Sequence, residues 1–296
     1  MSGWRVYQVD LQLKTPLHVG AATVGNIMRC RPYVPGKAIW GAVTATATML
    51  GSQSGAHVGK NEFEFVGSML KDWFRFGYFF PREHDGEPII ARERSDAFDF
   101  RFLETYSSTA MDGDSGSAEE NSLHEVEALR PVTRGTGNAV WLQGHIWVNA
   151  DHCFPRCSDD DVTFSANWNG SDINLDGLSL RDIIASAQLG GRRGYGYGRV
   201  GFPRMRLVSH QPGVQFDGEI VSLDSGSPAW AHVLAESPLV LLRGQAEPLV
   251  GREWLETVRD GAGQHIPAAT ICWAPGASFS GLSRFRVRWD GVWSPL

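Results

Sequence analysis

Twelve residues, Leu189 to Val200, carry the side chains best suited to contacting a polyanion. Their sequence, LGGRRGYGYGRV, contains five glycines, three arginines, two tyrosines and no acidic residue. Glycines let a ligand approach the main chain, and successive backbone N–H groups can form an anion-binding nest. Guanidinium groups bind phosphate, and tyrosine rings stack on bases. We therefore predict that this glycine-rich loop contacts RNA; the alternative is a tight turn with solvent-facing arginines.

Order and spacing argue against two nucleotide-binding motifs. A dinucleotide fingerprint, G-x-G-x-x-G, lies between a strand and a helix, whereas Gly194, Gly196 and Gly198 follow a helical pattern with G-x-G-x-G spacing. Residues 20–25 have G-x-x-x-x-G spacing but continue with Asn26, where a phosphate loop requires lysine. We predict no cofactor.

A second group of versatile side chains lies in GHIWVNADHCFPRC, residues 144–157. It offers four residue types that can bind zinc within a short span: His145, His152, Cys153 and Cys157. Their spacing fits no standard zinc finger, and adjacent residues of a strand cannot easily face one ion. We expect ordinary core and surface residues and predict no metal site; structural zinc is the alternative.

The elements flanking the glycine-rich loop can be predicted from periodicity. In GLSLRDIIASAQLGG, Ser179 can cap a helix and Gly190 can stop it. The apolar stripe of this helix would hold Leu180, Ile183, Ile184 and Ala187. The segments AVWLQGHIWVNA, before the helix, and RVGFPRMRLV, after the loop, are typical of strands.

The start of the chain predicts a strand, a loop and a helix. The strand would bury four alternating residues: Tyr7, Val9, Leu11 and Leu13. After the loop AATVGNIMRCRP, Pro35 and Gly36 can open a helix. The buried face of that helix would hold Ile39, Ala42, Val43 and Thr46.

The middle and the end of the chain suggest an insertion and a second region. Residues 92–125 place a small, polar, acidic tip between two strand-like arms, which predicts a projecting hairpin. The loop-like SHQPGVQFDG divides a domain, 1–210, from a smaller α+β region, 211–296, with a short helix near GREWLETV. In SRFRVRW, Arg284, Arg286 and Arg288 share one face, as on a solvated edge strand or a phosphate contact.

Composition limits the class of protein. The 296 residues lack an apolar run of the ~20 residues that a membrane span needs, and the N-terminus does not resemble a secretory signal. We expect a soluble cytoplasmic protein with four free cysteines and no membrane contact. The net charge is −6, so any polyanion site must be local. Only four of the 27 basic residues are lysines; this arginine usage suits RNA, and high genomic GC content would produce it equally.

Several of these segments together resemble the RAMP superfamily of CRISPR-associated proteins. The matching pieces are TPLHVG, then YVPGKAIWGAV, then SSTAMDGDSGSAEENSLHEVE, which is similar to the RNA-kinking thumb hairpin of the family, and finally LGGRRGYGYGRV. They occur in family order over roughly residues 10–205. The resemblance implies an α+β, ferredoxin-like (RRM-related) fold with an inserted thumb and a glycine-rich loop, and with either an accessory region or a degenerate second ferredoxin-like unit at residues 211–296.

The resemblance also separates three roles. Backbone-type members that cut target RNA carry an aspartate in the first loop, where AATVGNIMRC has no acid. Repeat-processing members are metal-independent endoribonucleases that use a histidine, for which His18 is the one candidate in this region. The short first loop, single hairpin and C-terminal addition look most like the five-type subunit, which caps the repeat-derived 5′ tag of CRISPR RNA (crRNA) in class 1, type III-like complexes. We expect no enzyme activity; the processing nuclease and the backbone-type subunit are the alternatives.

The capping role implies a set of contacts. Beside the loop residues Arg192, Arg193, Gly194, Tyr195, Gly196, Tyr197, Gly198 and Arg199, we predict RNA contact by Arg29, Arg31 and Lys37 near a helix N-terminus, and by Met111 as a wedge at the hairpin tip. The implied partners are crRNA, backbone seven-type RAMP subunits, a large subunit or effector nuclease and, indirectly, target RNA, in a ribonucleoprotein complex for antiviral defence.

Overall fold

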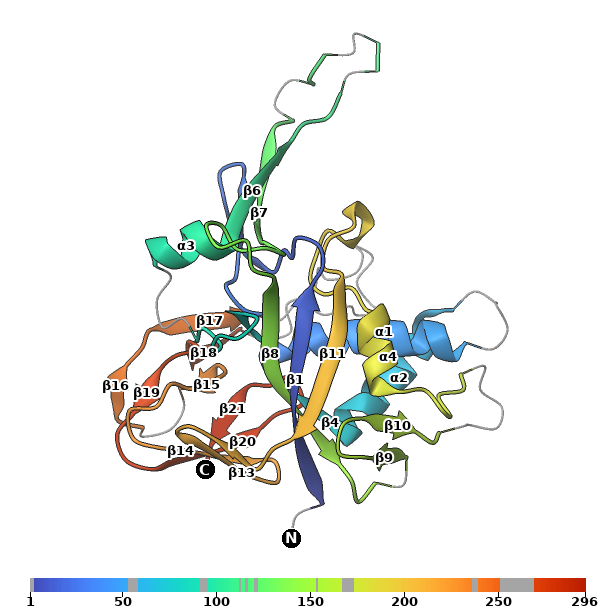
Figure 1. The fold of residues 1–296 in the computed structure, drawn as a ribbon, viewed down its shortest axis with the longest axis vertical. Helices are drawn as coiled ribbons and strands as arrows, with labels where there is room; N and C mark the ends of the chain where they lie inside the picture. The colour runs from blue at the N-terminus through green and yellow to red at the C-terminus, as the bar shows by residue number, and fades with distance from the viewer. Residues whose placement is uncertain are drawn as a thin grey trace.

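A five-stranded antiparallel sheet forms the centre of the molecule (Figure 1). The computed structural model describes residues 3–52, 58–90, 95–111, 113–114, 117–119, 122–152, 154–166, 173–235, 239–250 and 269–296. The central sheet contains β1 (Trp4–Leu13), β4 (Phe74–Phe76), β5 (Phe80–Glu83), β8 (Val140–Asn149) and β11 (Val200–Leu207). The strand order is β11-β1-β8-β4, with β5 also paired to β8. Taken along the chain, this is the fourth-first-third-second order of a ferredoxin-like fold, which confirms the predicted fold class.

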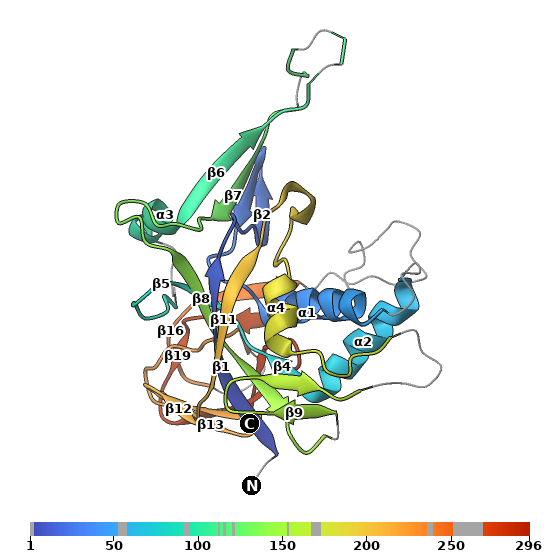
Figure 2. The same cartoon turned by 45° about the vertical axis from the view of Figure 1, so that its right-hand side comes forward.

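Helices cover one face of this sheet: α1 (Gly36–Gly51), α2 (Lys60–Trp73) and α4 (Leu180–Ser186) (Figures 1 and 2). The predicted buried residues of β1 lie in the core beneath them. The helix opened by Pro35 is confirmed, although Thr46 is only half-buried while Thr44 and Ala47 are buried. Burial of these apolar faces is what holds the helices on the sheet.

The helix before the glycine-rich loop is shorter than predicted. Ser179 caps it by accepting a hydrogen bond from the backbone N–H of Asp182, as predicted. The helix ends at Ser186 rather than running to Gly190. Residues 188 and 189 pair instead with the far end of the loop, since Leu189 N–H donates to the carbonyl of Gly198 at 2.8 Å. This long-range pairing overrides the local helical pattern.

A second sheet carries the predicted hairpin away from the central sheet (Figures 1 and 2). Its order is β2-β3-β7-β6, formed by β2 (Gly20–Val24), β3 (Ile27–Cys30), β7 (His124–Leu129) and β6 (Leu103–Ser108), with α3 (Asp96–Phe102) at its base. We call the β6–β7 hairpin the thumb. The segment AATVGNIMRCRP, expected to be a loop, contains an antiparallel hairpin formed by β2 and β3. Parallel pairing of β3 with β7 joins this hairpin to the thumb.

The described C-terminal residues form strands on the other face of the central sheet (Figure 1). An eight-stranded sheet contains β12 (His210–Gln211), β13 (Val214–Asp217), β14 (Ile220–Leu223), β20 (Ser283–Val287), β21 (Trp293–Pro295), β15 (Val233–Leu234), β18 (Ala269–Trp273) and β17 (Ala246–Val250), in that order. Two-stranded pairs are β9 (Pro155–Cys157) with β10 (Val162–Phe164), and β16 (Leu241–Arg243) with β19 (Ser278–Phe279). The helix expected near GREWLETV lies outside the described residues.

The edge interpretation of the arginine-bearing strand is wrong. β20 lies between β14 and β21, so both of its edges are paired. Arg286 forms an ion pair with Glu219 at 3.2 Å, and Arg288 forms one with Asp290 at 3.5 Å. Among the described cysteines, Cys30, Cys157 and Cys272 are not joined in disulfides. Within the described ranges every helix is too short or too polar to cross a bilayer.

Candidate RNA interface

The glycine-rich loop is closed at its base by backbone hydrogen bonds. Gly198 N–H donates to the carbonyl of Pro16 at 2.8 Å, while its own carbonyl accepts from Leu189. The φ of Gly198 is 78°, and a Cβ there would lie 1.9 Å from the Leu189 carbonyl oxygen. Only glycine fits this crossing of two chain segments, so the last glycine of the motif is required by the fold itself.

The outer part of the loop presents its side chains to solvent. A single 3-10 turn, η1 (Arg193–Tyr195), lies between Arg192, whose φ is 59°, and Gly196, whose φ is 83°. The side chain of Tyr195 is 77% exposed, the most exposed large aromatic ring in the described residues. The guanidinium of Arg192 lies 5.4 Å from the centre of this ring. An exposed ring beside an arginine can stack a base and hold its phosphate.

The loop also touches the base of the thumb. Arg192 donates a hydrogen bond to Nε2 of His124 in β7 at 3.3 Å and another to Sδ of Met28 in β3. Tyr197 packs edge-on against Tyr106 of β6, with ring centres 5.8 Å apart. Burial, followed by the nearby carboxylate of Glu104, raises the pKa of Tyr106 to about 12, so this ring stays neutral.

The loop arginines differ in their partners from nine of the other arginines that the structure describes. Arg29, Arg75, Arg82 and Arg101, for example, each form an ion pair with a carboxylate. In the described part of the chain, no carboxylate lies within 4.0 Å of the guanidinium groups of Arg192, Arg193, Arg199 or Arg204. In a protein of net charge −6, this leaves a local positive surface at the loop and along β11.

The remaining predicted contact residues divide into two groups. Arg29 follows Met28, the β3 residue that Arg192 contacts, and its guanidinium lies 3.5 Å from the Glu127 carboxylate. Met111 lies on the thumb beyond β6, 63% exposed. Arg31 and Lys37 are engaged elsewhere: Arg31 bonds Glu247 at 3.2 Å, and Lys37 lies 5.9 Å from the Trp289 ring. The structure therefore places these two against C-terminal residues rather than against the loop.

His18, the candidate general acid or base, lies beneath the loop rather than in an open cleft. Its side chain is buried, and Nδ1–H donates to the backbone carbonyl of Glu127 at 2.7 Å. Its own carbonyl accepts from Gly191 N–H at 2.9 Å. Among the described residues, no other side chain is hydrogen-bonded to the His18 ring. This geometry ties the segment that follows β1 to β7 and to the glycine-rich loop.

The four candidate zinc ligands do not come together where they are described. His145 is buried against Phe216 and Trp230, and burial lowers its pKa to about 3. Nε2 of His152 accepts a hydrogen bond from the Trp73 indole at 3.1 Å. Cys153 lies outside the described residues. Within the described ranges, no three His, Cys, Asp or Glu side chains form a group that could hold a metal ion.

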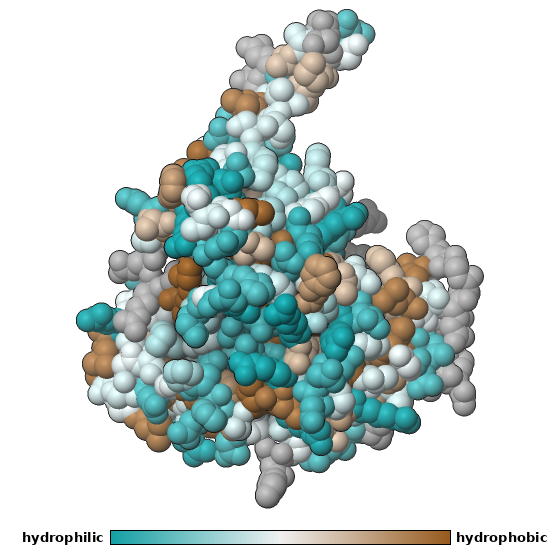
Figure 3. All heavy atoms as spheres, in the orientation of Figure 1, coloured by the Kyte–Doolittle hydropathy of each residue, from teal (hydrophilic) through white to brown (hydrophobic). Residues whose placement is uncertain are grey.

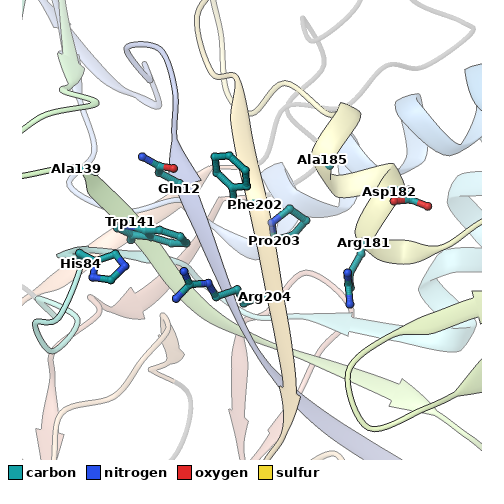
Figure 4. Close-up of a pocket in the computed structure, with 10 residues that line it drawn as sticks. All are labelled: Gln12, His84, Ala139, Trp141, Arg181, Asp182, Ala185, Phe202, Pro203 and Arg204. Carbon is teal, nitrogen blue, oxygen red and sulfur yellow. The ribbon is translucent and has the colours of Figure 1, made fainter.

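Sequence reasoning missed a pocket on the central sheet. Its volume is about 630 Å³, and it lies over β11, β1 and β8 near the glycine-rich loop (Figure 4). Its lining includes Gln12, Trp141, Phe202 and Arg204. The alternation of Arg204 and Arg206 in β11 was the available signal, but alternation does not reveal which sheet face is uncovered.

The fold and the loop define a class of protein: a ferredoxin-like domain with a projecting thumb and an arginine-bearing glycine-rich loop. The family model of the RAMP superfamily matches residues 10–201, more than half of the chain. The chain belongs to the RAMP superfamily.

Two solved structures are also similar to this chain. Both are cryo-EM structures of the type III-B Cmr-beta complex: one bound to cognate target RNA and AMPPnP, state 1, and one bound to cognate target RNA. The matched chains are 10% and 9% identical, with TM-scores of 0.48 and 0.46, and each match covers 92% of this chain and 86% of the other. No curated protein matches the sequence.

Proposed function

We propose that this protein is a noncatalytic RNA-binding subunit of a class 1 CRISPR effector complex, which holds the repeat-derived 5′ tag of crRNA. The observation that carries the proposal is that three features converge at one surface: Arg192, which has no carboxylate partner among the described residues, the exposed Tyr195 and the base of the thumb. A short single-stranded tag needs phosphate contacts and a few stacked bases, which this surface offers.

Both sides of the proposed tag site have a physical role. The loop supplies guanidinium groups and backbone N–H groups, while the thumb, with Met111 beyond β6, would separate tag from guide. The acidic remainder of the surface would limit nonspecific RNA binding and attract basic partner subunits. The partners would be seven-type backbone subunits and a large subunit or effector nuclease.

The geometry of His18 favours binding over cleavage. A general acid or base must reach the proton that it transfers, and a substrate must reach the histidine. The His18 ring is only 8% exposed and is held by a backbone carbonyl beneath the loop. We assign it a structural role.

One experiment separates the three roles. Purified protein is incubated with end-labelled repeat RNA, with mature guide RNA and with guide RNA lacking the tag, with and without EDTA, and run on native and denaturing gels. Salt-sensitive, tag-dependent binding to intact RNA is expected. A discrete EDTA-resistant cut, absent in His18→Ala, would establish the processing nuclease. Binding along the guide without need for the tag would indicate the backbone-type subunit.

A further inference from the structure

The pocket on the central sheet is built around a β-bulge. β11 pairs with β1 through Arg204 opposite Asp10 and Gly201 opposite Gln12, which leaves Phe202 and Pro203 facing a single residue of β1. At this bulge Phe202 adopts a φ of 50°, a left-handed conformation that is strained for a bulky side chain. Bulges re-aim side chains, and here the Phe202 ring is 66% exposed.

The side chain of Lys14, the residue that follows β1, lies beside the exposed ring. Nζ of Lys14 lies 4.0 Å from the centre of the Phe202 ring and donates a hydrogen bond to Oε1 of Gln12 at 2.6 Å. Among the described residues, Lys14 has no carboxylate within ion-pair distance. The Phe202 ring therefore extends into solvent from a strained backbone, with the Lys14 ammonium group beside it.

On the other side of Gln12, an arginine is held in place by an indole. Trp141 in β8 pairs directly with Gln12, and the guanidinium of Arg204 lies 4.7 Å from the Trp141 ring centre (Figure 4). His84 packs edge-on against the same ring at 5.4 Å. Arg204 is thus oriented by stacking rather than by a carboxylate, which leaves its donors for a ligand.

The charge and position of the pocket point to one kind of ligand. Of the described residues that line the pocket, only Asp182 is acidic. The face of the molecule over the central sheet is largely hydrophilic (Figure 3). Arg199 of the glycine-rich loop directly precedes β11, which carries both Phe202 and Arg204. A single-stranded RNA held at the loop would therefore reach the pocket while staying in contact with the protein surface.

We propose that this pocket is a second RNA subsite, in which a nucleotide adjoining those held by the glycine-rich loop stacks its base on Phe202 and places its phosphate on Arg204 and Lys14. The proposal rests on the proposed function, because the loop must hold RNA first. Single-stranded RNA is bound by stacking platforms combined with cationic grooves, and the pocket volume suits a nucleotide.

The test measures affinity by fluorescence anisotropy for two RNAs, the tag alone and the tag extended by guide nucleotides. Phe202→Ala and Arg204→Ala should each weaken binding of the extended RNA by roughly tenfold, as expected for loss of one stacked base or one phosphate contact. Phe202→Tyr keeps the ring and should bind as the wild type does. Arg284→Ala removes another exposed arginine without a carboxylate partner in the described structure and should change nothing.

The outcomes separate the subsite from the function on which it rests. If wild-type protein fails to bind either RNA, the proposed function is overturned. If the wild type binds and Arg192→Ala weakens it, but Phe202→Ala and Arg204→Ala bind both RNAs normally, the subsite alone is overturned. Should those two variants bind RNA normally and fail to assemble with partner subunits, the pocket is a protein interface instead.

Discussion

The guanidinium of Arg192 donates to Nε2 of His124 at 3.3 Å, and this contact joins the glycine-rich loop to the thumb. The two residues are 68 positions apart in the chain. Nδ1–H of His124 donates to the Ser122 carbonyl at 3.0 Å, so Nε2 is the acceptor that faces the loop. An RNA bound at this junction would contact both elements, and loss of Arg192 would affect both charge and geometry.

Arg192→Ala should weaken binding of tag RNA and make it less dependent on salt. Each phosphate contact on a single strand contributes about 0.7 to the slope of log affinity against log salt, so the slope should fall by about that amount. Anisotropy titrations at four salt concentrations measure it. Arg192→Lys, which keeps the charge, should retain the slope while binding more weakly. An unchanged slope in the alanine variant would place the RNA elsewhere.

The glycines of the loop should differ sharply in their tolerance of a methyl group. Gly198→Ala should lower the free energy of unfolding by roughly 2–4 kcal/mol, because φ is positive and the Cβ would collide with the Leu189 carbonyl. Gly194→Ala should stay within about 0.5 kcal/mol, because nothing lies within 4 Å of a Cβ there. Urea unfolding of both variants provides the comparison. An equal loss of unfolding free energy in the two variants would contradict the close contact between Gly198 and Leu189.

Removing the His18 ring should affect stability rather than chemistry. His18→Ala removes the buried hydrogen bond from the His18 ring to the backbone carbonyl of Glu127, which should cost roughly 1–3 kcal/mol. Thermal unfolding measures that cost, and a parallel assay with repeat RNA should show no cleavage by either protein. A stable variant that lost a cleavage activity present in the wild type would reverse this assignment.

A partly buried network between β17 and the ferredoxin-like domain should make stability depend on pH. The hydroxyl of Tyr78 lies 2.7 Å from Nδ1 of His232, whose Nε2–H donates to Glu247; Glu247 also pairs with Arg31. The hydrogen bond from His232 lowers the pKa of Glu247 to about 2, while burial lowers the pKa of His232. Both shifts favour a neutral histidine beside a charged carboxylate.

The sign of the pH effect follows from these shifts. A carboxyl whose pKa falls on folding stabilises the fold above its unfolded pKa, about 4.3, and loses this contribution as pH falls to about 2. Glu247→Gln should therefore be less stable than the wild type at pH 7 by about 1 kcal/mol, since Glu247 is partly exposed. The difference should shrink between pH 5 and 2 in chemical unfolding. A difference independent of pH would show that the carboxylate charge contributes nothing.

Local patterns were sufficient for much of the fold. The alternation of Tyr7 and Val9, the cap at Ser179 and the glycines of the loop are short-range signals, and each identified its element. Their order along the chain indicated a ferredoxin-like domain because few topologies accommodate it. The hairpin formed by β2 and β3 was missed because its parallel pairing with β7 joins residues almost 100 positions apart.

The sequence by itself determined the loop, its charge and the family. Glycine backbone freedom and arginine chemistry belong to the residues themselves and can be recognised without a structure. Only the tertiary structure decided which arginines are paired with a carboxylate and which can bind a phosphate. Arg31 is held by Glu247, 216 positions away, whereas Arg204 is stacked on Trp141 and left without a carboxylate in the described residues. Whether a guanidinium is paired depends on which distant groups folding brings near it, and single-chain periodicity does not contain that information.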